Sequence, residues 1–228
     1  MGKAGWFRII PFAVFMLFIG FQQVLEWTVV KGWLDLTARQ MLYLYPIKAL
    51  LVTGLLIFFW RKYSELHFAD FKNLTHTVAS VLLGLLVFVL WINMDWGIAT
   101  FGESKGFDPF LIDDSMTRNI MILSRLFGAA LVVPIMEELF WRSFMLRYVI
   151  TADFSSVRIG TYTLTSFLIC AVLFGLEHNL FLAGVMAGVA YSVLLYWTKS
   201  IYQCILAHAV TNLVLGIYVL QTGFWQFW

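Results

Sequence analysis

The sequence predicts an all-α membrane protein, a polytopic bundle of about seven transmembrane helices, in a range of about six to eight. Of the 228 residues, 61% are hydrophobic and 12% are charged, and the mean hydropathy is +0.85. Soluble domains average about 25% charged and about 45–50% apolar residues, so this composition belongs to the membrane class. The net charge of only +2 and the lack of a Lys/Arg-rich run argue against nucleic acid as a partner.

Seven apolar stretches account for the predicted helices. Lys3 and Arg8 precede the first, which continues beyond the roughly 7–15 residues of a signal-peptide core, so we expect it to remain as a membrane helix. The second contains Pro46 and Lys48 in its first turns, and the fourth is long enough for one extended helix. The stretches are residues 9–30, 41–60, 77–94, 118–150, 162–178, 181–197 and 201–223.

A long polar segment divides the chain into two groups of helices. Residues 95–117 form the longest stretch without apolar character and separate the third span from the fourth. We therefore expect residues 1–118 to hold three N-terminal spans with polar loops, residues 119–223 to form a helical core, and residues 224–228 to be a C-terminal tail. The sequence shows neither an internal repeat nor a soluble domain.

The distribution of Lys and Arg predicts a cytoplasmic N-terminus in an integral membrane protein, in the plasma (inner) membrane if the source is bacterial. Cytoplasmic loops carry an excess of these residues. With seven spans, one side holds Lys3, Arg8, Arg61, Lys62, Lys72, Arg147, Arg158 and Lys199. The other side holds Lys31, Arg39, Lys105 and Arg118. The first side is the richer and is expected to face the cytoplasm, which leaves the C-terminus outside.

The charged residues Glu137, Glu138 and Arg142 lie close together inside the fourth apolar stretch. Each ionisable group in hydrocarbon costs about 2.5–3.5 kcal/mol on insertion scales, so such groups usually serve a function. Glu138 and Arg142 share a helical face and can pair, whereas Glu137 points about 100° away. A buried carboxyl without an ionic partner suits a general base. The alternative is a structural pair of glutamates that fixes helix packing through Arg142.

Two further motifs place polar side chains at helical spacing. His178 follows Phe174 by one turn at the end of the fifth stretch, and His208 and Asn212 share one face of the seventh. Imidazole and carboxamide groups can donate hydrogen bonds to a developing oxyanion. Taken singly, His178 is better explained as an interfacial residue, and His208 with Asn212 as a pair that joins helices. Taken together, the three polar faces should converge, because none can comfortably face lipid.

This ordered set of motifs resembles the CPBP family of intramembrane proteases, which includes the Rce1-type CAAX prenyl endopeptidases and the bacterial Abi proteins. The family pattern is EExxxR, then FxxxH, then HxxxN, on successive membrane helices. The corresponding segments here are Glu137-Glu138-Leu139-Phe140-Trp141-Arg142, Phe174-Gly175-Leu176-Glu177-His178 and His208-Ala209-Val210-Thr211-Asn212. The resemblance covers about residues 120–220 and leaves residues 1–118 without a match.

The resemblance implies a membrane endopeptidase of the glutamic or metal-dependent type. Glu137 and His178 would activate a water for attack on a peptide carbonyl, and His208 with Asn212 would stabilise the oxyanion. The second glutamate and its arginine would brace the helix. The substrate would be a membrane-anchored or membrane-proximal protein with a hydrophobic or lipid-modified segment, and membrane lipids would surround the enzyme. The family also implies a cavity that opens to the cytosol.

A zinc ion is the alternative to a metal-free reaction. Glu137, His178 and His208 could form the His₂Glu set of some catalytic zinc sites. The sequence lacks HExxH spacing, in which one helix turn supplies two ligands, and a liganding Glu137 would leave Glu138 as the base. We therefore expect no cofactor.

Other functions fit the same residues. A non-enzymatic immunity or scaffold protein would keep the motifs for packing, and a proton-coupled transporter would use Glu137 and the histidines as a relay. The lack of repeated halves argues against a transporter. A cysteine transpeptidase would need Arg and His beside its cysteine; Cys170 and Cys204 have no such neighbours in sequence, and we expect both to be packed residues.

The depths of the motifs along straight helices disagree. At 1.5 Å per residue, Glu137 lies about 20 Å from the end of its stretch, His208 about 11 Å and His178 about 24 Å. If all three stretches end at the inner surface, the three side chains cannot meet. A tilt, a kink near Pro134, or a fifth helix that starts from an inward-projecting turn would bring them together.

Overall fold

The computed structural model describes residues 2–97, 100 and 106–228 and folds as a helical bundle. Six of its helical segments are long and apolar enough to cross a membrane, and a seventh apolar helix is shorter. The prediction of an all-α membrane bundle is therefore confirmed. The helices are α1 (Lys3–Val30), α2 (Ala38–Leu42), α3 (Leu44–Phe59), α4 (Leu74–Trp91), α5 (Ser115–Phe127), α6 (Val133–Glu138), α7 (Leu146–Tyr148), α8 (Leu164–Leu176), α9 (Phe181–Thr198) and α10 (Ile201–Thr222).

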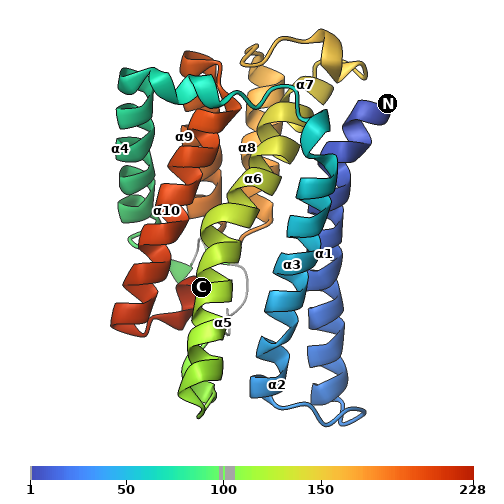
Figure 1. Cartoon of the computed structure of the whole chain (residues 1–228), viewed down its shortest axis with the longest axis vertical. Coiled ribbons are helices and arrows are strands. Elements are labelled where there is room, and N and C mark those ends of the chain that lie inside the picture. The colour runs from blue at the N-terminus through green and yellow to red at the C-terminus, as the bar shows by residue number, and fades with distance from the viewer. Residues whose placement is uncertain (1, 98–99, 101–105) are drawn as a thin grey trace.

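The helices run along one long axis, with the N-terminus at the upper end of the view in Figure 1. α1 descends, α2 and α3 return beside it, and α4 descends part of the way. α5, α6 and α7 rise as one continuous segment of 34 residues, Ser115–Tyr148. α8 then descends, α9 returns and α10 descends again. The order of segments follows the predicted spans.

The long rising segment contains two π-helical turns. The first, Gly128–Val132, ends just before Pro134. Proline has no N–H and cannot continue regular α-helical bonding, so a widened turn before it is expected. The segment changes direction between α5 and α6, as Figure 1 shows. The second π-helical turn, Leu139–Met145, follows Glu138 directly and carries Arg142.

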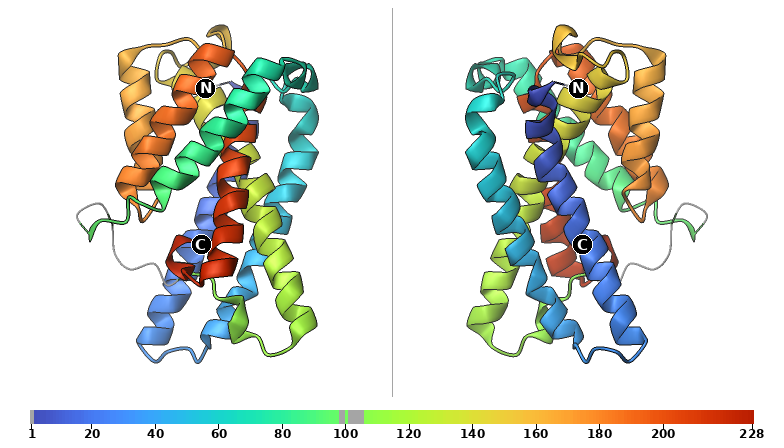
Figure 2. Two further views of the ribbon diagram at one scale, coloured as in Figure 1. Left: turned by 90° about the vertical axis from the view of Figure 1, so that its left-hand side faces the viewer. Right: turned by 90° about the vertical axis from the view of Figure 1, so that its right-hand side faces the viewer.

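The fifth predicted stretch forms a shorter helix than expected. α8 has only 13 residues, and at 1.5 Å per residue it is about 20 Å long. Its lower end and the turn into α9 lie about midway along the molecule (Figure 2). Small residues bring α8 and α9 together, since a Cβ placed on Gly184 would lie 2.9 Å from the Cα of Gly175. The turn therefore brings His178 to mid-depth.

Helix α10 packs closely against α4 and α9. A Cβ placed on Gly84 of α4 would lie 2.4 Å from the carbonyl oxygen of Ala207 on α10. Thr211 Oγ1 donates to the carbonyl oxygen of Gly84 at 2.9 Å, and Tyr191 of α9 donates from its hydroxyl to Thr211 Oγ1 at 2.8 Å. These contacts join the three helices that carry or flank the last predicted motif.

Buried arginines at the upper end have oxygen partners. Arg8 donates from Nε to Glu65 Oε1 at 2.8 Å and to Ser143 Oγ at 3.0 Å. Arg147 donates from Nη2 to Ser143 Oγ at 3.0 Å and from Nη1 to the carbonyl oxygen of Val157 at 3.1 Å. The contacts tie the start of α1 to the end of the long rising segment and close the bundle at this end.

The close approach of α4 to α10 predicts different effects on stability for two similar substitutions. Gly84→Ala should lower the free energy of unfolding by about 1–3 kcal/mol, because its Cβ would overlap the Ala207 carbonyl. Gly54→Ala, where an added Cβ meets nothing within 4 Å, should be neutral or stabilising by up to about 1 kcal/mol. Thermal unfolding of the full-length protein in detergent measures both. Equal melting temperatures for the two variants would contradict the close contact between these helices.

Candidate active site

Glu138 forms a buried ion pair with Arg142, as their spacing predicted. Arg142 donates from Nη1 to Glu138 Oε1 at 3.2 Å, and its Nε lies 3.2 Å from Oε2. Its Nη2 donates to the carbonyl oxygen of Gly188 on α9 at 3.3 Å. The guanidinium also packs over the rings of Phe174 and Tyr191, 4.4 and 5.3 Å from their centroids. One arginine therefore links its own helix to α8 and α9.

His208 joins α10 to the same carboxylate. Its Nδ1 lies 2.9 Å from Glu138 Oε1, and its ring stacks on Tyr191 with centroids 5.0 Å apart. Because an ionised carboxylate only accepts hydrogen bonds, we assign the proton to Nδ1 of His208 and make it the donor. The other ring nitrogen, Nε2, then lies 4.0 Å from Glu137 Oε2.

Glu137 faces a different environment from Glu138. Only 7% of its surface is exposed, and its Oε2 is buried with no hydrogen-bond partner among the described residues. An unsatisfied buried oxygen typically costs about 1–3 kcal/mol, and in proteins it calls for an explanation such as a bound water or a catalytic role. Glu137 lines a cavity of about 760 Å³. The carboxylate is therefore available to a water or substrate in that cavity.

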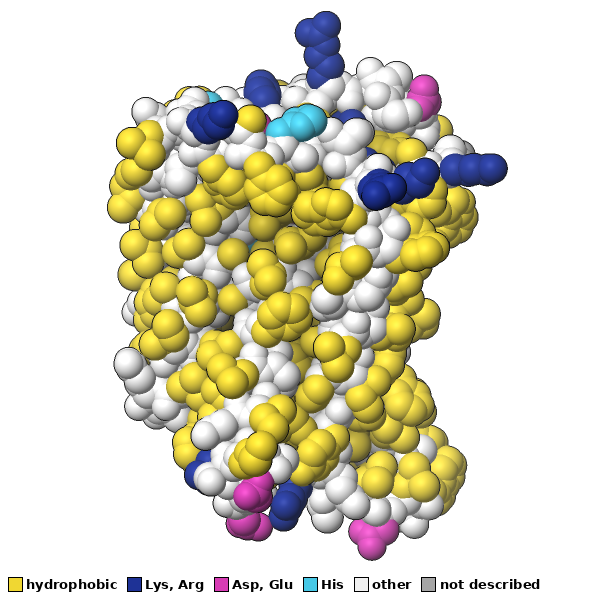
Figure 3. All heavy atoms as spheres, viewed as in Figure 1, with side chains coloured by type: hydrophobic (Ala, Val, Ile, Leu, Met, Phe, Trp, Pro, Cys, Tyr) yellow, Lys and Arg dark blue, Asp and Glu magenta, His cyan; other side chains and the backbone are white. Residues whose placement is uncertain are grey.

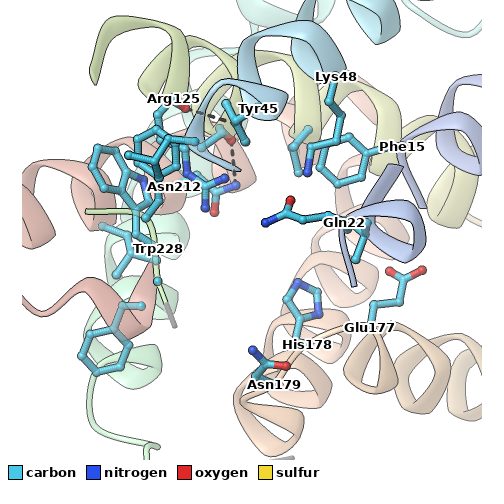
Figure 4. A pocket seen from close by; sticks show the side chains of 18 of the residues that line it. Phe15, Gln22, Tyr45, Lys48, Arg125, Glu177, His178, Asn179, Asn212 and Trp228 are labelled. Atoms are coloured by element: carbon cyan, nitrogen blue, oxygen red, sulfur yellow. Dashed lines mark hydrogen bonds between the residues drawn. The ribbon is translucent and has the colours of Figure 1, made fainter. Parts of the chain in front are cut away.

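The cavity extends from mid-depth toward the lower end of the molecule. Lys48 and Tyr45 lie across it from Glu177 and His178, with the side chain of Gln22 between the two walls (Figure 4). Lining residues near the α1–α2 connection are Glu26, Val29, Val30, Leu36, Ala38 and Met41. The lining thus continues from the glutamate motif to the end where α1 meets α2.

His178 lines the same cavity as Glu137. Its Nδ1 lies 2.8 Å from the carbonyl oxygen of Phe174, so Nδ1–H is the donor and Nε2 is free to accept a proton. Trp91 packs edge-on against the imidazole with centroids 5.3 Å apart. The depth conflict seen in the sequence is resolved because α8 is short and ends at mid-depth.

Asn212 also lines the cavity, but one of its amide hydrogens is already used. Its Nδ2 donates to the carbonyl oxygen of Ala129 at 2.8 Å. Ala129 lies in the π-helical turn before Pro134, where the missing proline N–H leaves a carbonyl without its helical donor. A carboxamide has two N–H donors, so the second remains for a ligand.

Sequence reasoning did not assign Glu177 to the site. Its Oε2 accepts a hydrogen bond from Trp141 Nε1 at 3.0 Å, and its side chain lines the cavity beside His178. Its position next to the histidine of the second motif is the only local signal for it. The half-depth turn that places it in the cavity depends on long-range packing of α8 and α9.

The described residues contain no group of three or more His, Cys, Asp or Glu side chains placed to hold a metal ion. The zinc set considered from the sequence was Glu137, His178 and His208. The Nδ1 of His208 is occupied by Glu138, and the three side chains do not form a ligand set.

One comparison with known proteins gave a match. Residues 119–214 match the family model described as type II CAAX prenyl endopeptidase, Rce1-like. Comparisons with curated proteins and with solved structures gave no match. The matched stretch begins in α5 and ends in α10, so it contains Glu137, Glu138 and Arg142, His178, and His208 with Asn212. This part of the chain, less than half of its length, is therefore similar to a domain of the Rce1-like CAAX prenyl endopeptidase (CPBP) family, a family of membrane proteases.

Proposed function

We propose that the protein is an intramembrane endopeptidase that hydrolyses a peptide bond of a membrane-anchored or membrane-proximal substrate. The observation that supports this most strongly is the free carboxylate oxygen of Glu137, which is buried, unpartnered and next to His208. A carboxylate in that state can take a proton from a water molecule in the cavity. The apolar residues among those that line the cavity, such as Phe15, Ile19 and Leu215, suit an apolar or lipid-modified segment of the substrate.

Glu137 acts as the general base. It removes one proton from a water whose oxygen attacks the carbonyl carbon of the scissile peptide bond. His178 accepts a hydrogen bond from the same water through Nε2, because its Nδ1 proton is held by the Phe174 carbonyl. When the tetrahedral intermediate collapses, the proton on Glu137 passes to the leaving amine nitrogen. The products are a carboxylic acid and an amine, which become a carboxylate and an ammonium group by proton exchange, and Glu137 is restored as a carboxylate.

His208 and Asn212 stabilise the oxyanion. For Nε2 of His208 to donate, the ring carries a proton on both nitrogens while its Nδ1–H remains bonded to Glu138. The four groups Glu137, Glu138, Arg142 and His208 then have no net charge, which lowers the cost of burying them. The second N–H of Asn212 supplies the other donor, since its first is bonded to Ala129. Glu138 and Arg142 act as positioning residues.

A structural role is the competing explanation, because the contacts of Glu138 with Arg142 and His208 would hold the helices together in any protein. Such a role, as in an immunity or scaffold protein, uses Glu138 and leaves Glu137 without a task. Substituting each of the two adjacent glutamates in turn therefore distinguishes a proteolytic role from a purely structural one.

Glu137→Gln tests the proposal. The substitution keeps the size of the side chain and removes the base, so cleavage should fall by at least about 100-fold. Cellular proteomics of N-terminal and C-terminal peptides, comparing the wild type with the variant at equal membrane levels, measures this and identifies the substrate. Peptide ends that disappear in the variant support a protease.

Glu138→Gln is the matched control. It breaks a buried ion pair, which typically costs about 3–5 kcal/mol, so it should lower the melting temperature as well as cleavage. Glu137→Gln should leave the melting temperature unchanged. Identical peptide ends in the wild type and in Glu137→Gln, in cells where the protein is required, would contradict proteolysis and favour the structural role.

We also propose that the end with the N-terminus faces the cytoplasm. Lys and Arg side chains are more frequent at this upper end, most of the visible acidic side chains lie at the lower end beside further Lys and Arg side chains, and an apolar band lies between the two ends (Figure 3). All eight Lys and Arg residues predicted for the inner side lie on segments of the upper end, while Lys105 of the outer set lies outside the described residues. With this orientation the cavity opens to the outer side, in contrast to the cytosolic opening that the family resemblance implies.

Cysteine labelling tests the orientation. In a background with Cys170→Ala and Cys204→Ala, Ala38→Cys places a thiol on the cavity lining near the α1–α2 connection, and Lys62→Cys places one at the opposite end. A membrane-impermeant maleimide added to intact cells should react with the first and should reach the second only after the membrane is broken. The reverse pattern would place the cavity opening on the cytoplasmic side.

A further inference from the structure

Two cationic side chains in the cavity wall share one aromatic ring. The Nζ of Lys48 lies 5.1 Å from the ring centroid of Tyr45, and the Cζ of Arg125 lies 4.3 Å from the same centroid. Lys48 also lies 4.2 Å from the ring of Phe15 and is only 6% exposed. Figure 4 shows Lys48, Tyr45 and Arg125 along the cavity. Lys48 is therefore buried and Arg125 half-buried beside the same ring in the cavity wall.

Neither cation is neutralised by the described part of the chain. Lys48 Nζ forms no hydrogen bond and no ion pair with a described residue, and Arg125 Nε is buried without a hydrogen-bond partner. The other buried cations differ, since Arg8 pairs with Glu65, Arg142 with Glu138, and Arg147 donates to backbone carbonyls. Ring faces attract cations but supply no countercharge. An unpaired cation at membrane depth is costly and usually marks a functional site.

The acidic side chains that line the same cavity do not pair with Lys48 or Arg125. Glu177, on the wall opposite Lys48, accepts a hydrogen bond from Trp141, and Glu26 accepts one from Gln22. Asp108 accepts from the backbone N–H of Phe110. No carboxylate of the described residues pairs with Lys48 or Arg125, which leaves both side chains available to an anionic ligand.

The position of the two cations indicates which molecule supplies the anion. Arg125 precedes Glu137 by twelve residues on the same helical segment, which is about 18 Å along the axis. An extended peptide covers that distance in about five or six residues. Arg125 is also ten residues inside α5, about 15 Å from the lower end of that helix. An anion held there is carried by the molecule in the cavity rather than lying at the surface with the lipid headgroups.

We propose that Lys48 and Arg125 form an anion subsite that binds a carboxylate of the peptide substrate, about five residues from the bond cut at Glu137. The guanidinium fork matches the geometry of a carboxylate, and Lys48 adds a second point charge. This inference rests on the proposed function, because it takes the occupant of the cavity to be a peptide. The subsite adds a requirement to the substrate, which should carry an acidic group on one side of its apolar segment.

Peptide binding to the full-length protein tests the subsite. All proteins carry Glu137→Gln to prevent turnover and are placed in phosphatidylcholine nanodiscs. The probes are three hydrophobic peptides of equal length: one blocked at both ends, one with a free C-terminal carboxylate, and one blocked but with a glutamate near its C-terminus. Calorimetry should show that at least one acidic peptide binds about tenfold more tightly than the neutral one.

Variants assign this preference to the two cations. Lys48→Met combined with Arg125→Met should remove the preference, whereas Lys31→Met, an exposed lysine at the same end that does not line the cavity, should keep it. The charge-retaining Arg125→Lys should also keep it. If the double variant unfolds, Lys48→Met alone decides, because it should weaken the preference without lowering the melting temperature.

Three results would overturn the subsite: equal binding of all three peptides, binding of none, or a preference that survives in the double variant. A lipid source has its own readout. If a lipid supplies the anion, native mass spectrometry of protein taken from phosphatidylglycerol membranes would detect phosphatidylglycerol on the parent protein and none on the double variant. The acidic peptides would not displace this lipid. Loss of cleavage in Glu137→Gln together with equal peptide binding would refute the subsite and leave the protease.

Discussion

The polar core depends on one buried carboxylate, that of Glu138. Its side chain has no exposed surface, and it is approached by Arg142 from its own segment and by His208 from α10. Isolated charges in a low-dielectric interior are unstable, while a charge with close, hydrogen-bonded partners is tolerated. Glu138 therefore fixes where α10 lies relative to the rising segment, and Arg142 extends the link to α9 through Gly188. Without this carboxylate, the other polar groups would have no fixed geometry.

The helical period separates the tasks of the two adjacent glutamates. Consecutive residues point about 100° apart, so when Glu138 faces the packed core, Glu137 faces the cavity. The same chemical group is therefore bonded to Arg142 and His208 at one position and lines the cavity at the next. The half-depth turn between α8 and α9 then brings His178 to the level of the glutamate, which a helix crossing the whole bilayer would not do.

Much of the fold follows from the sequence, because the apolar stretches have lengths near those needed to span a bilayer. The Glu138–Arg142 pair also follows, since four residues separate the two along one helix. Contacts between helices do not follow. Nothing local shows that Asn212 donates to Ala129, that Glu177 lines the cavity, or that Lys48 lies near Arg125. The composition of the fifth stretch predicts a full membrane span. The shorter helix that it forms, α8, depends instead on glycine contacts with α9. The catalytic roles of Glu137, His178, His208 and Asn212 and the domain boundaries remain predictions.

The protonation state of His208 tests the central interaction most directly. Nitrogen-15 NMR of histidine-labelled protein in bilayers, with the His208→Gln variant to assign the signals, reports whether each ring nitrogen carries a proton. The bonding to Glu138 predicts that Nδ1 is protonated, and the proposed oxyanion role predicts that Nε2 is protonated too. A wild-type His208 with a bare Nδ1 would contradict the proposed core of the site.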